Sequence, residues 1–243
     1  MVRSKPVLAG ATVLFLVTET LLGIAFQTGT EYGRPLRFAA VVLACLFCGL
    51  FAERSREYLL TQAALLLTVC ADWFLVLPPY PNQLPGMLFF AAAQRAYAAR
   101  LYGSDGRPSR RRAQIISRLC LSVIAMTAAV LVLGKVTDAV ALISLFYYVN
   151  LILNLIFAWS QSPKQTVLAA GLTLFLLCDT LVGFAFLDGY LTVEKGSLID
   201  RINHPGFDLA WAFYLPSQML LAVSLLPRRW SRATTPNPRN TEN

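Results

Sequence analysis

The chain has 243 residues, of which 56% are hydrophobic and only 14% are charged, and its formal net charge is +8. Soluble domains carry roughly 25% charged residues, and disordered chains combine low hydrophobicity with high charge. Both classes are therefore excluded, and the composition predicts an integral membrane protein.

Eight apolar segments follow one another along the chain, each close to the roughly 20 residues that a helix needs to cross a bilayer. They cover residues 7–27, 36–52, 58–79, 83–102, 113–134, 137–160, 164–187 and 207–226. Glu19 interrupts the first segment and no cleavage site of small residues follows it, so we expect a retained helix. The sequence predicts an all-α, polytopic bundle in one domain over residues 1–230, followed by a disordered cytoplasmic tail over residues 231–243.

Lysine and arginine are unequally divided between the two sides of the predicted bundle. Thirteen lie at the N-terminus, in the 53–57 and 103–112 connections, at Lys164 and in the C-terminal tail, against five on the opposite side. The positive-inside rule then places both termini in the cytoplasm. The basic excess is a topology signal that also attracts anionic headgroups, and nucleic acid is not expected as a partner. A bacterial inner membrane is the expected location, with the endoplasmic reticulum left open.

Two stretches resemble each other across the halves of the chain. Leu65 to Asp72 parallels Leu174 to Asp179, and each stretch is followed by a second similar pair, Phe90 to Gln94 and Tyr214 to Gln218. A unit of four helices repeated once keeps its orientation, because four crossings return the chain to the starting side. A 4+4 parallel repeat would therefore place Asp72 and Asp179 at one depth, although such similarity also arises by chance in apolar sequence.

Three acidic residues, Glu19, Asp72 and Asp179, lie inside the predicted spans. An ionisable side chain costs roughly 2.5–3.5 kcal/mol at the centre of a membrane helix, so it usually faces a cavity or a partner. At about 1.5 Å per residue, each acid lies roughly 9–12 Å below the outer end of its span. A common level predicts a common site, while a structural ion pair of Glu19 with Arg95 or Arg37 stays open.

Polar residues at helical spacing on other spans reach the same level or the midplane. These are Gln94 and Tyr97, Tyr214 and Gln218, and the series Tyr147, Asn150 and Asn154. Together they predict a polar pocket in the outer half of the bundle. For Tyr147, Asn150 and Asn154, plain hydrogen bonding between helices is the alternative.

Two carboxyl groups close together in a low dielectric do not both ionise easily, so one is expected to act as an acid and the other as a base. The chain has no Ser-His-Asp set, zinc motif or Walker motif, and its five cysteines lie in apolar runs. No metal or cofactor is therefore expected. The residues permit acid/base hydrolysis or proton-coupled transport.

Five short motifs occur in order between residues 34 and 224. They are Arg34-Pro35-Leu36; Ala71-Asp72; Gly86, Phe90, Gln94 and Tyr97; Gly171, Phe175 and Asp179; and Tyr214 to Leu221. This ordered set resembles the YhhN-like lysoplasmalogenase family. Two positions depart from the family pattern, because Gln94 stands where the family has histidine and Ala71 where it has glycine.

The resemblance implies hydrolysis of the vinyl-ether bond of lysoplasmalogens to a fatty aldehyde and glycerophosphoethanolamine or glycerophosphocholine. Asp72 and Asp179 would form the catalytic pair. Substrate-binding residues would be Glu19, Gln94, Tyr97, Asn150, Tyr214 and Gln218, with Arg34 or Arg37 on the phosphate at the outer mouth. The alternative is a non-enzymatic lipid-binding protein or proton-coupled transporter, which the histidine loss would favour.

Overall fold

The computed structural model describes residues 5–28, 32–105, 108–186, 189–190, 195, 197, 199 and 208–226. The predicted tail, 231–243, lies outside the described residues. The elements are α1 (Lys5–Gln27), α2 (Gly33–Phe51), α3 (Arg56–Leu75), α4 (Gln83–Asp105), α5 (Pro108–Leu133), the 3₁₀ turn η1 (Gly134–Val136), α6 (Ala139–Ser160), α7 (Thr166–Phe186) and α9 (Leu209–Val223). The described part of the chain contains no strand, which confirms the all-α, polytopic class.

Side-chain caps and prolines mark where several helices begin. Ser55, Asp138 and Asp208 each accept a hydrogen bond from the backbone N–H three residues further on, at 3.1, 2.7 and 3.3 Å, which satisfies a donor that the helix leaves unpaired. Pro35 and Pro108 stand in the first turns of α2 and α5, where proline is tolerated. For this reason α2 and α5 begin before the predicted residues 36 and 113.

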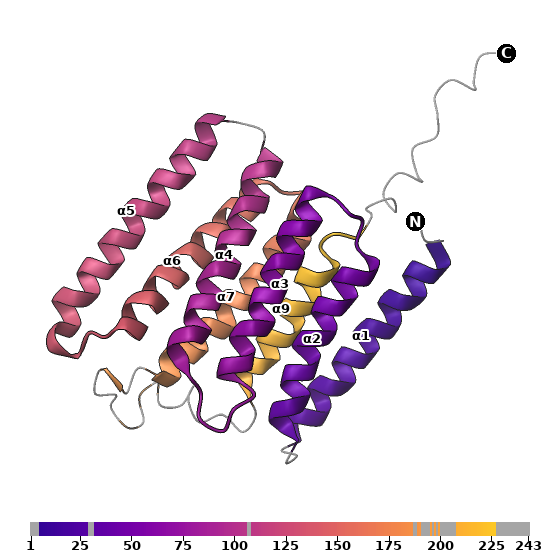
Figure 1. Cartoon of the computed structure of the whole chain (residues 1–243), viewed down its shortest axis with the longest axis horizontal. Helices are drawn as coiled ribbons and strands as arrows, with labels where there is room; N and C mark the ends of the chain where they lie inside the picture. Colours follow the sequence, from indigo (N-terminus) through magenta and orange to yellow (C-terminus); the bar gives the residue numbers. More distant parts are fainter. Residues whose placement is uncertain are drawn as a thin grey trace.

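Among the described residues, six helices are long and apolar enough to cross a membrane by length and composition, namely α1, α2, α3, α5, α6 and α7. The other two predicted spans are α4 and α9. In α4 the apolar run contains Gln94 and Arg100, both buried, and α9 has only 15 residues. Both helices pack against several of these six: α4 contacts α3, α5 and α6, and α9 contacts α1, α2, α3 and α7 (Figure 1).

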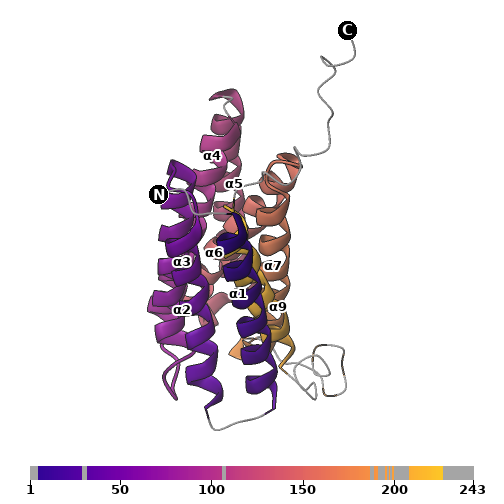
Figure 2. The same ribbon diagram turned by 90° about the vertical axis from the view of Figure 1, so that its right-hand side faces the viewer.

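The packing of the helices follows a repeated pattern. Helices α2, α3, α4, α6, α7 and α9 form a closed ring in that order, and α1 and α5 lie outside it. Helix α1 packs on α2 and α9 (Figure 2), and α5 packs on α6 and α4. Pairing α1 with α5, α2 with α6, α3 with α7 and α4 with α9 therefore maps each contact around the ring, and each contact of the two outer helices, onto another, as expected of a 4+4 parallel repeat.

Close helix packing within the hairpins depends on small residues. A Cβ atom on Gly86 of α4 would lie 2.4 Å from Cγ of Leu75 in α3, and one on Gly171 of α7 would lie 3.0 Å from Leu221 in α9. Small residues allow helix backbones to approach closely inside a membrane. The two glycines therefore bring together the α3–α4 and α7–α9 pairs that carry Asp72 and Asp179.

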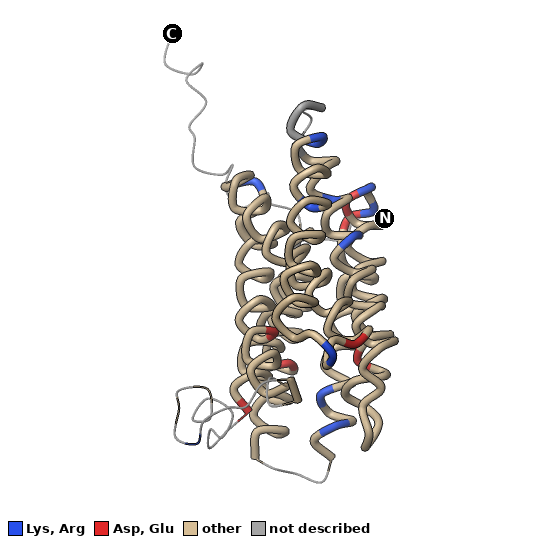
Figure 3. Tube along the Cα trace, turned by 90° about the vertical axis from the view of Figure 1, so that its left-hand side faces the viewer, with Lys and Arg blue, Asp and Glu red and all other residues tan. Residues whose placement is uncertain are grey.

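The bundle has two chemically different ends. Helix α1 begins and α9 ends at the same end, which we call the terminal end; the opposite end is called the pocket end (Figure 1). Lysine and arginine gather at the terminal end (Figure 3), where the exposed residues are Arg54, Arg56, Arg111, Arg112 and Lys164. The two ends thus differ in charge as the sequence predicts, while the cytoplasmic assignment of the terminal end stays a prediction.

Candidate active site

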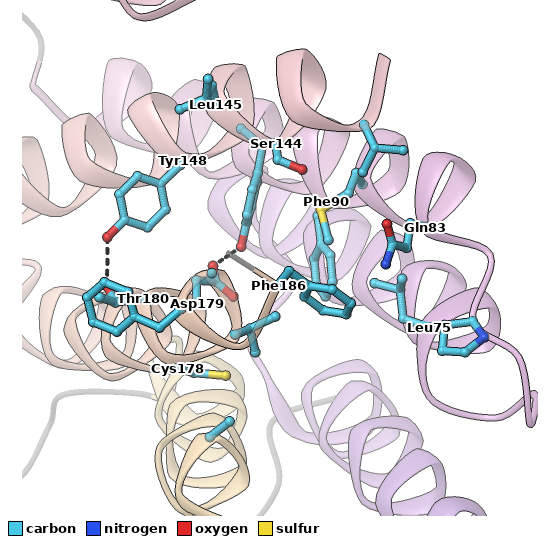
Figure 4. Close-up of a pocket in the computed structure, with 18 of the residues that line it drawn as sticks. Leu75, Gln83, Phe90, Ser144, Leu145, Tyr148, Cys178, Asp179, Thr180 and Phe186 are labelled. Atoms are coloured by element: carbon cyan, nitrogen blue, oxygen red, sulfur yellow. Dashed lines mark hydrogen bonds between the residues drawn. The ribbon is translucent and has the colours of Figure 1, made fainter. Parts of the chain in front are cut away.

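A cavity of about 630 Å³ lies at the pocket end of the bundle. Its walls come from the helix ends at this side, including Leu75 of α3, Gln83 of α4, Val140 of α6, Phe186 of α7 and Ala210 of α9 (Figure 4). Most lining side chains are aliphatic or aromatic. Ligand pockets of roughly 300–1,000 Å³ with a few convergent polar groups have this character.

Asp72 is one of two carboxylic acids among the lining residues. It lies in the last turn of α3, and its side chain is 2% exposed. The hydroxyl of Tyr214 in α9 donates a hydrogen bond of 2.5 Å to Asp72 Oδ2. Because an ionisable group inside a membrane helix needs a polar partner, Tyr214 fixes this carboxyl group at the inner wall of the cavity.

Asp179 of α7 is the second acid, and it has a tyrosine partner of its own. Its Oδ2 accepts a hydrogen bond from the hydroxyl of Tyr147 in α6. The next residues on both helices are also joined, since the Tyr148 and Thr180 hydroxyls are 2.7 Å apart (Figure 4). Two adjacent hydrogen bonds between α6 and α7 therefore hold Asp179 at the cavity wall.

The two carboxyl groups share one electrostatic environment. Both carboxyl groups line the same cavity. Aromatic rings enclose them: Phe90 contacts the rings of both Tyr147 and Phe175, with centroids 5.7 Å apart in each pair. Apolar walls lower the local dielectric and strengthen the coupling between charges. Such a pair is suited to sharing one proton between an acid and a base.

An ion pair holds the start of α9 at the edge of the cavity. Arg37 of α2 lies 2.6 Å from Asp208, and its guanidinium stacks over the ring of Trp211, which lines the cavity. Gln27 of α1 bonds both backbone groups of Asp208, at 2.7 and 2.9 Å. These contacts join three helices and orient the Trp211 wall.

Tyr190 lines the cavity outside the membrane-spanning helices. Its hydroxyl donates to the carboxylate of Asp138, at 3.1 and 3.2 Å. Partial desolvation, and then the bond to Asp138, raise the pKa of Tyr190 above its ordinary value. The phenol therefore stays protonated at neutral pH and keeps residue 190 attached to the cap of α6.

A comparison with models of protein families shows which family the chain belongs to. A model described as the YhhN family matches residues 32–225, which includes every ring helix and both aspartates. The chain belongs to the YhhN family. No protein of curated function and no solved structure matches it.

The YhhN-family chain brings only part of the predicted site to the cavity. Asp72, Asp179 and Tyr214 line it, whereas Gln94 and Asn150 do not. Gln94 instead accepts two hydrogen bonds of 2.8 Å from Asn154, through its backbone and side-chain oxygens. Asn150 and Asn154 bind the buried guanidinium of Arg118, at 3.2 and 2.7 Å. The interhelical alternative therefore describes these two asparagines in the YhhN-family structure.

Four other predicted site residues also lie away from the cavity. Glu19, Tyr97 and Gln218 are completely buried, and in the part of the chain that the structure describes no hydrogen-bond partner contacts their side-chain polar atoms. Arg34 is exposed at the start of α2. The open alternative that Arg37 pairs with Glu19 does not hold, because Arg37 pairs with Asp208.

Several residues that line the YhhN-family cavity are not among the predicted site residues. The sequence predicts Tyr147 either in the pocket or in a hydrogen bond between helices, and in the structure it lines the cavity and donates to Asp179. Tyr148, Thr180 and Trp211 carried no separate signal because hydroxyl and aromatic groups are common in membrane helices. Asp179 and Thr180 are adjacent on α7, and they face the adjacent Tyr147 and Tyr148 on α6. This pairing of adjacent polar residues is the pattern that could have identified Tyr148 and Thr180. Among the described residues, no three His, Cys, Asp or Glu side chains gather as a metal site would require.

Proposed function

We propose that this YhhN-family protein is a membrane-embedded lipid hydrolase that cleaves the vinyl-ether bond of lysoplasmalogens. The products are a fatty aldehyde and glycerophosphoethanolamine or glycerophosphocholine. The observation that carries the proposal is the pair Asp72 and Asp179, each bonded to a tyrosine, in one apolar cavity. Membership of the YhhN family is consistent with this reaction.

The shape and lining of the cavity suit a lipid with one chain. Its apolar residues come from several helices, including Met87 of α4, Leu133 of α5 and Val182 of α7, and would accept the alkenyl chain. Its polar groups are concentrated at the two aspartates and their tyrosines. The glycerophosphate would remain near the pocket end, where Arg34 is exposed and is our proposed phosphate contact.

The residues support a mechanism that begins with proton transfer to carbon. One aspartic acid donates its proton to the second carbon of the alkenyl group, which leaves an oxocarbenium-like centre at the first carbon. The other carboxylate stabilises this centre and takes a proton from water as the water oxygen bonds to it. The hemiacetal then breaks its bond to the glycerol oxygen, which receives a proton, and the aldehyde is released. Tyr147 and Tyr214 would keep the two carboxyl groups in position.

The terminal end of the ring favours a hydrolase over a transporter. Here the buried guanidinium of Arg100 donates to Thr61 of α3 at 2.9 Å, to Ser224 at 2.8 Å and to Gln165 at 3.1 Å. These bonds join α4 to α3, to the residue after the end of α9 and to the residue before the start of α7. A transport path would need this cluster to open, whereas a reaction confined to the outer cavity would not.

Turnover of a purified protein tests the proposal. In detergent or liposomes, the protein should release aldehyde from lysoplasmenylethanolamine or lysoplasmenylcholine. The matched control is the saturated alkyl-ether lysolipid, which has the same shape but no double bond to protonate. Aldehyde release from the vinyl ether alone supports the proposal; binding without release from either lipid would contradict it.

We also propose that both termini are cytoplasmic in a bacterial inner membrane, which labelling of single cysteines from each side would check.

A further inference from the structure

Glu19 is a buried acid outside the proposed catalytic pair. Its side chain is completely buried and neither carboxyl oxygen has a hydrogen-bond partner in the described part of the chain. It lies on the inner face of α1 between Phe15, which stacks on Phe47 at 4.2 Å, and Phe26, which contacts Trp211 at 5.4 Å. A carboxyl group in such surroundings is costly unless something polar reaches it.

The packing register places Gln218 opposite Glu19. A Cβ atom on Gly23 of α1 would lie 3.0 Å from Leu215 of α9, and the two helices run in opposite directions (Figure 1). One helical turn toward the terminal end therefore reaches Glu19 on α1 and Gln218 on α9. The side chain of Gln218 is also fully buried, and neither its amide oxygen nor its nitrogen has a hydrogen-bond partner among the described residues. An acid and an amide with complementary donors and acceptors thus share one level.

In the other repeat, protein side chains occupy the position that corresponds to Glu19 and Gln218. In the repeat, α5 corresponds to α1 and α4 corresponds to α9, so Gln94 corresponds to Gln218. There, Asn154 of α6 connects Gln94 to Arg118 of α5 by hydrogen bonds of 2.8 and 2.7 Å. On the equivalent helix α2, Phe47 stacks on Phe15 of α1. One turn toward the pocket end from this pair, Glu19 therefore lies near the level of Ala44, which is fully buried. A small side chain thus stands where the other half has a bridging amide.

The level of Glu19 and Gln218 lies about one helical turn from Tyr214, toward the terminal end of the bundle. Gln218 is four residues after Tyr214, so both side chains project from one face of α9 one turn apart. Tyr214 donates to Asp72 at 2.5 Å. Tyr214 and Gln218 of α9 therefore lie between Asp72 and the level of Glu19.

We propose that Glu19 and Gln218 form an internal water site between α1 and the ring, separate from the lipid cavity, that supplies water toward Asp72. Water has the two to four polar partners here that a buried molecule requires. The supply role rests on the proposed function, because each hydrolysis consumes one water while the alkenyl chain fills the apolar cavity. The hydration itself does not depend on that function.

Infrared spectroscopy tests the hydration directly. The carboxyl band of Glu19 is the band that Glu19→Gln removes. In the wild-type protein it should shift when H₂O is replaced by D₂O, and in Gln218→Leu it should move toward the frequency of a carboxyl group without a hydrogen bond. A Glu19 band unaffected by D₂O or by Gln218→Leu would overturn the site. Thermal unfolding of each variant shows that it is folded.

Turnover tests the supply role separately. With saturating lysoplasmalogen, Gln218→Leu and Glu19→Leu should lower kcat by roughly tenfold with little change in KM, because substrate binding is unaffected. Met219→Leu, a change of similar volume on the neighbouring position, should keep wild-type kcat. Unchanged kcat in both variants would remove the supply role. If the wild-type protein has no turnover, the proposed function fails, while the infrared result still decides whether the water site exists.

Discussion

Tyr214 and Asp72 are 142 positions apart in the sequence, yet the tyrosine hydroxyl lies 2.5 Å from Oδ2 of the aspartate. This bond crosses the ring from α9 to α3. The aspartate is almost fully buried, so its other possible solvent contacts are few. The last helix of the chain therefore positions an acid that the third helix carries.

Loss of this hydroxyl should slow the proposed reaction. Hydrogen bonds to charged groups contribute about 1.5–3 kcal/mol, so Tyr214→Phe should lower kcat/KM by roughly 10- to 100-fold in the aldehyde assay. Tyr58→Phe is the control, because its hydroxyl lies near the terminal end and donates a long hydrogen bond of 3.5 Å to Gly49 O. Equal activity of the two variants would show that Tyr214 does not position Asp72.

The close contact between α3 and α4 can be tested through a glycine. A Cβ atom on Gly86 would meet Leu75 at 2.4 Å, and overpacking costs about 1–3 kcal/mol. Gly86→Ala should therefore lower the thermal midpoint in detergent. Gly10→Ala is the matched control, since nothing lies within 4 Å of the new atom and alanine favours a helix by roughly 0.5–1 kcal/mol. A more stable Gly86→Ala variant would contradict the packing.

Buried Arg118 should stabilise the α4–α5–α6 region through neutral acceptors. Arg118→Met leaves the side-chain oxygens of Asn150 and Asn154 without their donor, which should lower the free energy of unfolding by about 1–3 kcal/mol. Adding Asn154→Leu should cost less in this variant than in the wild type, because the two share one bond. Additive losses would show that the hydrogen bond contributes nothing. Exposed Arg112→Met should have little effect.

Arg37 should act through Asp208 and not through a lipid phosphate. Their ion pair of 2.6 Å is partly exposed, so breaking it should cost about 0.2–1 kcal/mol of stability. Arg37→Gln and Asp208→Asn should raise KM by similar factors, and the double variant should add little. A much larger KM increase for Arg37→Gln alone would indicate direct phosphate binding. Arg34→Gln, in contrast, should raise KM without changing unfolding.

The helices and the acid pair could be predicted from local sequence, because both depend on features within a single segment. Apolar length predicts a span, and an acid inside a span marks a site whichever way the helix is turned. Asp72 and Asp179 line one cavity for this reason. Helix starts were less accurate where proline begins a helix, as at Pro108.

The partners of each polar residue could not be predicted, because they depend on helix order and rotation. Gln94 and Gln218 occupy matching positions in the repeat, but both turn away from the cavity, and only Gln94 has a bridging asparagine. Depth alone placed Glu19 with the two aspartates. Glu19 does not reach the cavity with them, because its helix α1 lies outside the ring and packs against α2 and α9.

The most direct test of the central claim is aldehyde release by wild-type protein and by Asp72→Asn and Asp179→Asn, purified side by side with thermal unfolding as a check on folding. General acid or base catalysis contributes about 10²–10⁴-fold, and asparagine keeps the size of each side chain while removing its exchangeable carboxyl proton. Each variant should therefore remain folded and lose at least about 100-fold in kcat. Full activity in both folded variants would contradict the account.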